Sequence, residues 1–250
     1  MKILLSGALG FMGREVALQV RTESDENRIL CGVDEVKGET DFPLYERFED
    51  APTADVVIDF SSPKALSGVL KYCVERHVPA VLCTTGYDDK QLEDIFEASK
   101  QVALFRSGNM SVGIALLRSL AKKAAMVLGE SFDVEIIETH HNRKKDAPSG
   151  TALMLLDAIQ DAYAEPHAEV YGRHGRNCPR EKGEIGIHAL RGGTVIGEHE
   201  VYFLGPSERI RLSHSIENRS VFASGALRAA LFLMTKDSGL YDMDDLVRRL

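Results

Sequence analysis

The first 110 residues alternate short apolar runs with amphipathic stretches, and this order limits the possible folds more than any other feature of the chain. Such apolar runs are typical of strands buried on both faces of a parallel sheet, and the stretches between them are typical of crossover helices. We expect strands at 2–6, 28–33, 54–60, 79–83 and 102–105, with helices at 14–21, 64–76 and 92–99. The alternation predicts an α/β fold with a Rossmann-like, doubly wound parallel sheet.

The first predicted strand leads into a glycine-rich turn, Gly7-Ala8-Leu9-Gly10-Phe11-Met12-Gly13. In dinucleotide-binding folds such a turn lets the backbone approach the pyrophosphate, and the next helix offers N–H groups at its N-terminus. The glycine spacing alone is weak evidence, but Asp34 follows the second strand, 21 positions after Gly13. A carboxylate about 20 positions on is expected to bind the adenosine ribose. Asp34 favours NADH over NADPH because it repels a 2′-phosphate, whereas the nearby Arg14 and Lys37 act against that preference.

Polar turns follow the later strands, at 61–62, 84–86 and 107–109. Ligands of doubly wound sheets bind beyond the carboxyl ends of the strands, which is where these turns fall. Ordinary connecting loops have a similar composition, so the turns support a cofactor site without proving one.

The second half of the chain has a different pattern. It predicts helices at 112–128, 151–163 and 220–236, and strands at 132–139, 185–191, 197–204 and 208–215. Strands that mostly follow one another in the sequence, without a helix between them, indicate an α+β domain. We therefore expect a dinucleotide-binding domain of residues 1–110 plus 220–250, because the last helix suits packing on the first sheet, and a second domain of residues 111–219.

Composition excludes several classes of protein. The net charge of −8 disfavours nucleic-acid partners, and no apolar run approaches the ~18 residues needed to cross a bilayer. The N-terminus reads as a strand and not as a signal peptide. Four scattered cysteines fit reduced thiols in a cytoplasm. His174 and Cys178 lie four positions apart without a second pair, so no metal site is expected.

Residues 138–152 place two histidines and several basic residues between a predicted strand and a predicted helix. His140 and His141 are neighbours at a strand end, so we expect their side chains to diverge and to serve two roles. An imidazole suits proton donation near neutral pH. Lys144 or Lys145 can bind an anionic substrate or deliver a proton.

The same stretch begins a helix. Asp146 or Ser149 can cap it, and Gly150 leaves its backbone bare. The Thr151 hydroxyl and the first N–H groups of the helix then form a cradle for a carboxylate or a phosphate. The alternative is a solvated basic loop before a capped helix, but the whole combination, beside a predicted nicotinamide site, favours an active site.

The run Glu138-Thr139-His140-His141, continued by Lys144 and by Asp146-Ala147-Pro148-Ser149-Gly150-Thr151-Ala152, closely resembles the signature of the 4-hydroxy-tetrahydrodipicolinate reductase (dihydrodipicolinate reductase) family. The likeness extends over nearly the whole chain. Further matching runs are the glycine turn, Val57-Ile58-Asp59-Phe60-Ser61, Thr84-Thr85-Gly86, Asn109-Met110-Ser111-Val112-Gly113, Gly197-Glu198-His199 and Phe222-Ala223-Ser224-Gly225-Ala226. The motif from the two histidines to Gly150-Thr151 is specific to this family.

The resemblance implies an enzyme of the diaminopimelate route to lysine. Such an enzyme uses NADH or NADPH to reduce a small cyclic dicarboxylate imine, converting 4-hydroxy-tetrahydrodipicolinate to tetrahydrodipicolinate with loss of water. The resemblance also implies a homotetramer that is joined through the sheets of its substrate-binding second domains.

The resemblance implies roles for individual residues. His140 matches the proton-donor histidine and Lys144 matches the catalytic lysine, the other proposed acid. Substrate-binding positions are His141, Ser149, Gly150 and Thr151. Cofactor-binding positions are Gly7, Ala8, Leu9, Gly10, Phe11, Met12, Gly13, Asp34, Cys83, Thr84, Thr85, Ser107, Gly108, Asn109 and Met110.

The chain departs from the family pattern at two positions. Relatives often have a basic residue where this chain has Phe11, and its loss removes a partner for a 2′-phosphate. With Asp34, this departure favours NADH. Cys83 replaces the usual glycine before Thr84-Thr85 and is expected to crowd the backbone slightly near the cofactor.

Two other functions remain open at this level. One is a two-domain reductase of the aspartate-semialdehyde or homoserine dehydrogenase type, but the former needs a nucleophilic cysteine and none lies in a suitable stretch. The other is a regulator that senses NAD(H) without catalysis. Intact His140, Lys144 and Thr151 argue against a regulator.

Overall fold

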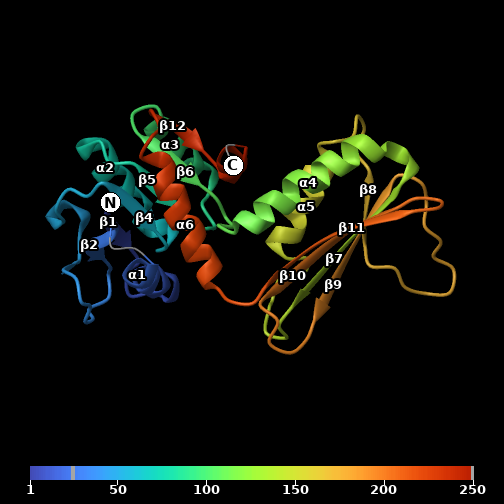
Figure 1. Cartoon of the computed structure of the whole chain (residues 1–250), viewed down its shortest axis with the longest axis horizontal. Coiled ribbons are helices and arrows are strands. Elements are labelled where there is room, and N and C mark those ends of the chain that lie inside the picture. The colour runs from blue at the N-terminus through green and yellow to red at the C-terminus, as the bar shows by residue number, and fades with distance from the viewer. Residues whose placement is uncertain (24–25, 249–250) are drawn as a thin grey trace. The chain divides into compact units, whose positions relative to one another are not determined.

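The chain forms two units, each built on its own sheet (Figure 1). The computed structural model describes residues 1–23 and 26–248. The first unit comprises Met1–Val112 and Arg219–Leu250, and the second comprises Gly113–Asn218. The second unit is therefore inserted into the sequence of the first.

Seven strands form the sheet of the first unit, in the order β12-β6-β5-β4-β1-β2-β3, and all their pairings are parallel. They are β1 (Lys2–Ser6), β2 (Arg28–Val33), β3 (Leu44–Tyr45), β4 (Val56–Asp59), β5 (Ala80–Leu82), β6 (Ala103–Arg106) and β12 (Gly239–Tyr241). The five predicted strands are confirmed. The sequence does not predict β3 and β12, because strands of two or three residues are too short to show a periodic pattern.

Helices cover both faces of this sheet, which confirms the doubly wound α/β fold. On one face α1 (Phe11–Glu23) contacts α6 (Ser220–Leu233), and the rings of Phe105 on β6 and Phe232 on α6 meet edge to face at 6.1 Å. On the other face α2 (Leu66–Arg76) contacts α3 (Asp89–Ser99). Short helical turns at Phe48–Asp50 (η1) and Pro63–Ala65 (η2), and the helix α7 (Met243–Val247), complete the unit.

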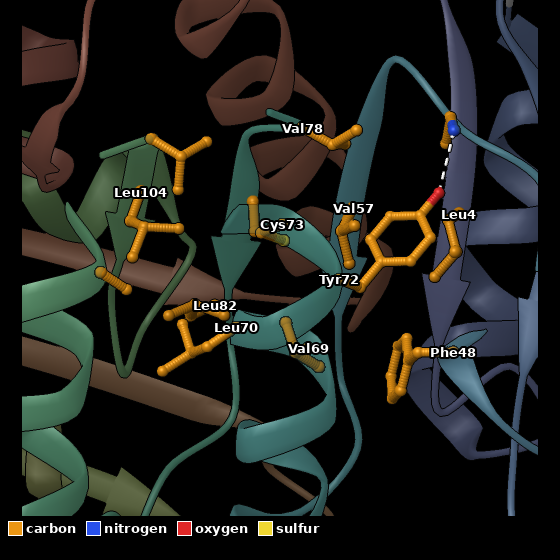
Figure 2. Packing of buried hydrophobic residues seen from close by; sticks show 14 of the residues in the cluster. Leu4, Phe48, Val57, Val69, Leu70, Tyr72, Cys73, Val78, Leu82 and Leu104 are labelled. Carbon is orange, nitrogen blue, oxygen red and sulfur yellow. Dashed lines mark hydrogen bonds between the residues drawn. The ribbon is translucent and has the colours of Figure 1, made fainter. Parts of the chain in front are cut away.

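The core under α2 shows how the strand pattern specifies this arrangement (Figure 2). Leu4 and Val57 project from neighbouring strands and pack against Val69 and Cys73 of α2, and all four side chains are fully buried. Burying a valine or leucine side chain contributes about 1.5–3 kcal/mol. The hydroxyl of Tyr72 enters the same core, but it accepts a bond from Ala54 N and donates one to Pro52 O, so its burial leaves no polar group unpaired.

The second unit is a five-stranded mixed sheet in the order β11-β10-β7-β9-β8. Its elements are α4 (Val112–Leu128), η3 (Gly129–Ser131), β7 (Asp133–His140), α5 (Gly150–Gln160), β8 (Ala168–Tyr171), β9 (Glu184–Arg191), β10 (Gly197–Leu204) and β11 (Arg209–Ile216). Pairs β8·β9 and β7·β9 are parallel, whereas β10 is antiparallel to both β7 and β11. The predicted α+β fold is confirmed, and among the described strands of this unit the short, mostly exposed β8 was not predicted.

Both long helices of the second unit, α4 and α5, pack on the same face of its sheet (Figure 1). Alternate residues of β7 and β10 face them, for example Val134, Ile136 and Val201, which are fully or almost fully buried. The opposite face carries half-buried and exposed side chains, among them Ile137 and Leu190. Among the described helices of either unit, none has both the length and the apolar character that a membrane span requires.

Candidate active site

A cleft of about 610 Å³ opens at the carboxyl ends of the first unit's strands. Four of the predicted cofactor residues line it, namely Gly7, Leu9, Gly10 and Asp34. The same edge includes the loop after β4, at Phe60–Ser62. The cleft therefore lies where doubly wound folds bind a dinucleotide.

Close packing requires two glycines of the predicted glycine-rich segment. Gly7 has φ +75°, and a Cβ there would lie 2.7 Å from the carbonyl oxygen of Phe60. Gly13 lies inside α1 and not in the turn, and a Cβ there would lie 2.2 Å from the carbonyl oxygen of Gly7. The first glycine thus shapes the turn and the last lets α1 approach it, as the dinucleotide fingerprint requires. The residues present fit a bound dinucleotide.

Asp34 connects the end of β2 to the glycine turn. Its Oδ2 accepts a bond of 2.9 Å from Leu9 N, and its Oδ1 accepts one of 3.0 Å from Val36 N. The two cations considered in the sequence analysis also line the cleft, but both have partners. Arg14 Nε donates to Leu9 O, and Lys37 Nζ lies 3.3 Å from a carboxylate oxygen of Glu46.

The remaining eleven predicted cofactor residues do not line this cleft, as far as the described residues define it. Ala8 is buried, and Phe11, Met12 and Gly13 begin α1. The other seven follow β5 and β6: Cys83, Thr84, Thr85, Ser107, Gly108, Asn109 and Met110. Phe11 is 60 % exposed, and the guanidinium of Arg219 lies 5.5 Å from its ring centre.

The loops after β4 and β5 meet at a buried carboxylate, Asp59. Thr84 Oγ1 donates to Asp59 Oδ2 at 2.7 Å, and Ser61 Oγ donates to Oδ1 at 2.5 Å. Cys83 is buried beside them, and burial raises the pKa of its thiol well above the ordinary value. The thiol therefore stays protonated and is no nucleophile, which removes the cysteine that an aspartate-semialdehyde dehydrogenase would need from this position.

In the second unit, Glu138 and His140 lie two positions apart on β7, so both project toward the helix-covered face. Glu138 is fully buried, and its Oε2 lies 2.6 Å from Nδ1 of His140. Arg191, the register partner of His140 on β9, donates to both carboxylate oxygens of Glu138, at 2.7 and 2.8 Å. Arg191 also donates to the carbonyl oxygen of Asp146 at 2.7 Å.

The start of α5 is fixed against the same carboxylate. Ser149 N donates to Glu138 Oε1 at 3.0 Å, while Ser149 Oγ accepts a bond from Ala152 N and caps the helix. Of the two predicted capping residues, Ser149 is therefore the one that caps. A third histidine, His199 on β10, places its Nε2 3.1 Å from Ser149 Oγ.

Lys144 and His141 lie in the loop between β7 and α5. The Lys144 ammonium lies 2.9 Å from Asp146 Oδ1, and Lys144 N donates to the carbonyl oxygen of His141. Gly150 has nothing within 4 Å of the place where a Cβ would be, so space is open beside the first turn of α5. Thr151 is the second residue of that helix.

Burial and charge set the protonation of these groups. Burial alone raises the pKa of Glu138, but hydrogen bonds, foremost that from Arg191, outweigh burial and hold this pKa below its ordinary value. Burial lowers the pKa of His140, although Glu138 acts in the opposite direction. Burial also lowers the pKa of His199, to about 4. Glu138 is therefore ionised and His199 neutral around pH ~7.

The predicted site comprises His140, His141, Lys144, Ser149, Gly150 and Thr151. The structure joins His140 and Ser149 through Glu138, and it pairs Lys144 with Asp146. The sequence predicted no role for Glu138, Arg191 or His199. Glu138 belonged to the quoted motif, and the two-residue spacing from His140 on a strand was a usable signal. Arg191 and His199 come from other strands, and no local pattern links them to the motif.

Known proteins resemble this chain over almost its whole length. The family model described as dihydrodipicolinate reductase, N-terminus, matches residues 1–110, and its C-terminus counterpart matches residues 113–247. Two similar curated proteins are called 4-hydroxy-tetrahydrodipicolinate reductase. That of Caldanaerobacter subterraneus subsp. tengcongensis is 48% identical over 249 residues, and that of Clostridium novyi is 46% identical, each covering 99% of this chain and 98% of the relative.

Solved structures share the fold. A dipicolinate-bound dihydrodipicolinate reductase from Paenisporosarcina sp. TG-14 superposes with a TM-score of 0.83 at 24% identity, covering 98% of both chains. A scyllo-inositol dehydrogenase from Lactobacillus casei reaches 0.61 at 15% identity, covering 99% of this chain and 93% of that one. The family models and the near full-length relatives show that this chain belongs to the dihydrodipicolinate reductase family.

Proposed function

We propose that the chain reduces 4-hydroxy-tetrahydrodipicolinate to tetrahydrodipicolinate with NADH or NADPH and with loss of water, on the diaminopimelate route to lysine. One observation carries the proposal: His140 and the first turn of α5 both bond the buried carboxylate of Glu138, and Arg191 joins that carboxylate to Asp146, the partner of Lys144. This arrangement puts a proton donor beside cationic and helix-end groups that suit a dicarboxylate. Relatives named for the reaction support it.

His140 delivers the proton in this proposal. Its Nδ1 is engaged by Glu138, so Nε2 is the ring nitrogen that faces the substrate. Gly197 keeps space beside it, since a Cβ there would lie 3.2 Å from Nε2. Lys144 is the second candidate acid, and its charge also lowers the pKa of His140. His141, Gly150 and Thr151 bind the substrate carboxylates at the positive end of the α5 dipole, while Ser149, whose polar groups bond Glu138, Ala152 and His199, caps that helix.

The dinucleotide is held in the first unit by the glycine turn, with Asp34 on the adenosine ribose. When bound, NADH or NADPH supplies the hydride that the imine accepts. Residues after β5 and β6, namely Cys83, Thr84, Thr85, Ser107, Gly108, Asn109 and Met110, hold the rest of the cofactor. We propose NADH as the preferred form, because Asp34 faces the cleft while Arg14 and Lys37 are engaged by other groups.

We further propose that the reductase works as a homotetramer in the cytoplasm. The face of the second sheet away from α4 and α5 carries Ile137, Tyr202 and Leu190, the last 48% exposed. A sheet face with exposed apolar side chains suits a self-complementary interface between copies.

A coupled assay tests the function. The product of the preceding synthase is supplied together with NADH or NADPH, and oxidation of the cofactor is followed by its absorbance. We expect oxidation with both cofactors and a higher kcat/KM with NADH. Cofactor binding without substrate-dependent oxidation would leave only a nucleotide sensor, and a strong preference for NADPH would contradict the role given to Asp34.

A further inference from the structure

We propose that Glu138 and Arg191 act as a positioning pair, which sets the tautomer and direction of the His140 ring and couples that ring to the Lys144 loop and to the start of α5. The inference rests on the proposed function, because it takes His140 as the proton donor. Neither residue needs to touch the substrate. Both act through the groups that do.

The bonding of Glu138 fixes the hydrogen on His140. Oε1 accepts from Arg191 Nη2 and Ser149 N, and Oε2 accepts from Arg191 Nη1 and lies 2.6 Å from His140 Nδ1. The guanidinium and the amide can only donate, so the carboxylate is an acceptor throughout. Nδ1 of His140 must then carry a hydrogen in every protonation state. The exchangeable proton of the ring is the one on Nε2.

Arg191 extends the same constraint to the loop. One of its nitrogens donates both to Glu138 and to the carbonyl oxygen of Asp146, whose carboxylate lies 2.9 Å from the Lys144 ammonium. Ser149 N ties the first turn of α5 to the same oxygen, Glu138 Oε1. A single carboxylate–guanidinium pair therefore sets the position of the histidine, the lysine and the helix end together. A fixed arrangement of this kind is what proton transfer requires.

Stability alone does not account for such a pair. Burying two charges is costly, and well-packed apolar side chains in their place are often equally or more stabilising. The same strand provides a comparison. Glu135, on the opposite face of β7, also bonds a histidine at 2.6 Å, His188, and pairs with Arg173 and Arg180. That cluster has the same chemistry, but among the described residues no hydrogen bond or ion pair joins it to Glu138, His140 or Arg191.

Glu138 and Arg191 have opposite effects on the pKa of His140. Glu138 on β7 favours the charged ring, whereas Arg191 on β9 and Lys144 in the loop disfavour it. His199 on β10 lies 5.2 Å away, ring centre to ring centre, and is neutral above pH ~5. Because a proton donor works only while charged, turnover falls as pH rises through the pKa of His140.

Glu138→Gln keeps the shape and removes the charge. We expect kcat to fall about 10- to 100-fold, the KM for NADH to stay unchanged, and the alkaline fall in kcat to move down by about one pH unit. In ¹⁵N NMR of the enzyme without ligands, the wild-type ring of His140 should be the Nδ1–H tautomer, and the variant should show a mixture. The tautomer is read without any turnover.

In Arg191→Gln, the decrease in kcat at high pH (the alkaline limb of the pH profile) should move the other way, to higher pH, because the charge of Arg191 lowers the pKa of His140. If that variant does not fold because Glu138 is left unpaired, Glu138→Gln with Arg191→Gln removes both charges and should give the mixed tautomer of the first variant. Glu135→Gln is the matched control, and it should leave both the limb and the His140 tautomer in place.

The outcomes separate the two proposals. A wild-type enzyme without reductase activity overturns the proposed function. An active wild type in which Glu138→Gln changes neither kcat, the pH limb nor the tautomer overturns the positioning role alone. An Nε2–H tautomer in the wild type also overturns it, as does an equal shift of the limb in Glu135→Gln.

Discussion

His199 Nε2 and Ser149 Oγ lie 3.1 Å apart, and both side chains are buried. Ser149 Oγ also accepts the capping bond from Ala152 N, so its own hydrogen is available for Nε2. With Nε2 as the acceptor, the ring hydrogen of neutral His199 lies on Nδ1, which has no partner among the described residues. A second proton on the ring would turn Nε2 into a donor and leave a charge in the core.

The first prediction concerns stability in acid. Burial lowers the pKa of His199 from 6.5 to about 4, so the unfolded chain takes up the proton first as pH falls. The stability of the folded chain that depends on neutral His199 is fully present above the unfolded pKa of 6.5. As pH falls from about 6.5 to about 4, the free energy of unfolding decreases by about 3 kcal/mol in total. Urea unfolding across that range should show a flatter dependence in His199→Gln. The exposed His174→Gln should keep the wild-type slope; equal slopes in all three would contradict the assignment.

The second prediction separates chemistry from cofactor binding. His140→Ala and Lys144→Ala should each lower kcat by about 10²-fold or more, because each removes a candidate proton donor. The dissociation constant of NADH, measured by fluorescence titration, should change little, since the glycine turn and Asp34 belong to the first unit. Equal loss of NADH affinity in both variants would show that these residues have another role.

The third prediction concerns the choice of cofactor. Asp34→Asn keeps an acceptor for Leu9 N but removes the charge that faces a 2′-phosphate. The ratio of kcat/KM for NADPH to that for NADH should rise by about tenfold or more. Asp41→Asn, at an exposed carboxylate that pairs with Arg21, serves as the control. An unchanged ratio in Asp34→Asn would remove the basis for the NADH preference.

The fourth prediction compares two glycines that face one atom. A Cβ on Gly13 would lie 2.2 Å from Gly7 O, whereas one on Gly10 would lie 3.2 Å from the same oxygen. Gly13→Ala must displace α1 and should lower the free energy of unfolding by about 3 kcal/mol, with about 1 kcal/mol or less for Gly10→Ala. Thermal unfolding measures both. The reverse order would mean that the turn, and not the helix, sets the close approach.

The fifth prediction tests the proposed assembly. Leu190 is exposed on the open face of the second sheet, so Leu190→Arg should cost the single chain little. If copies join through that face, the substitution buries charges in the interface and should convert tetramers to smaller species in sedimentation velocity. Met126→Arg, at an exposed position on α4, is the control. A wild-type monomer would end the proposal.

The helices and strands that are long enough to repeat their apolar pattern several times could be predicted from the sequence. The apolar face of Val112–Leu128 repeats over several turns, and the Gly197–Leu204 strand alternates from end to end, so their predicted limits match the structure. Leu44–Tyr45 and Gly239–Tyr241 become strands only because a neighbour offers its edge. That partner is far away in sequence and leaves no local pattern.

The candidate site divides in the same way. Glu138, His140 and Ser149 belong to one local motif, and strand alternation brings the first two to one face. Arg191 reaches Glu138 because β9 pairs with β7, although 43 residues lie between the end of β7 and the start of β9. Hydrogen bonds between such strands depend on which strands are neighbours in the sheet. A single sequence shows the residues but does not show which strands are neighbours.

The insertion of the second unit has a consequence for synthesis on the ribosome. The sheet that begins with β1 gains its last strand, β12, only at Gly239–Tyr241, and α6 covers its face from residue 220 onward. Residues 113–218 emerge before either of these pieces exists. The inserted unit can therefore fold while the nucleotide-binding half still has a bare edge at β6, and a nascent chain halted in this interval displays that edge to chaperones and to other nascent chains.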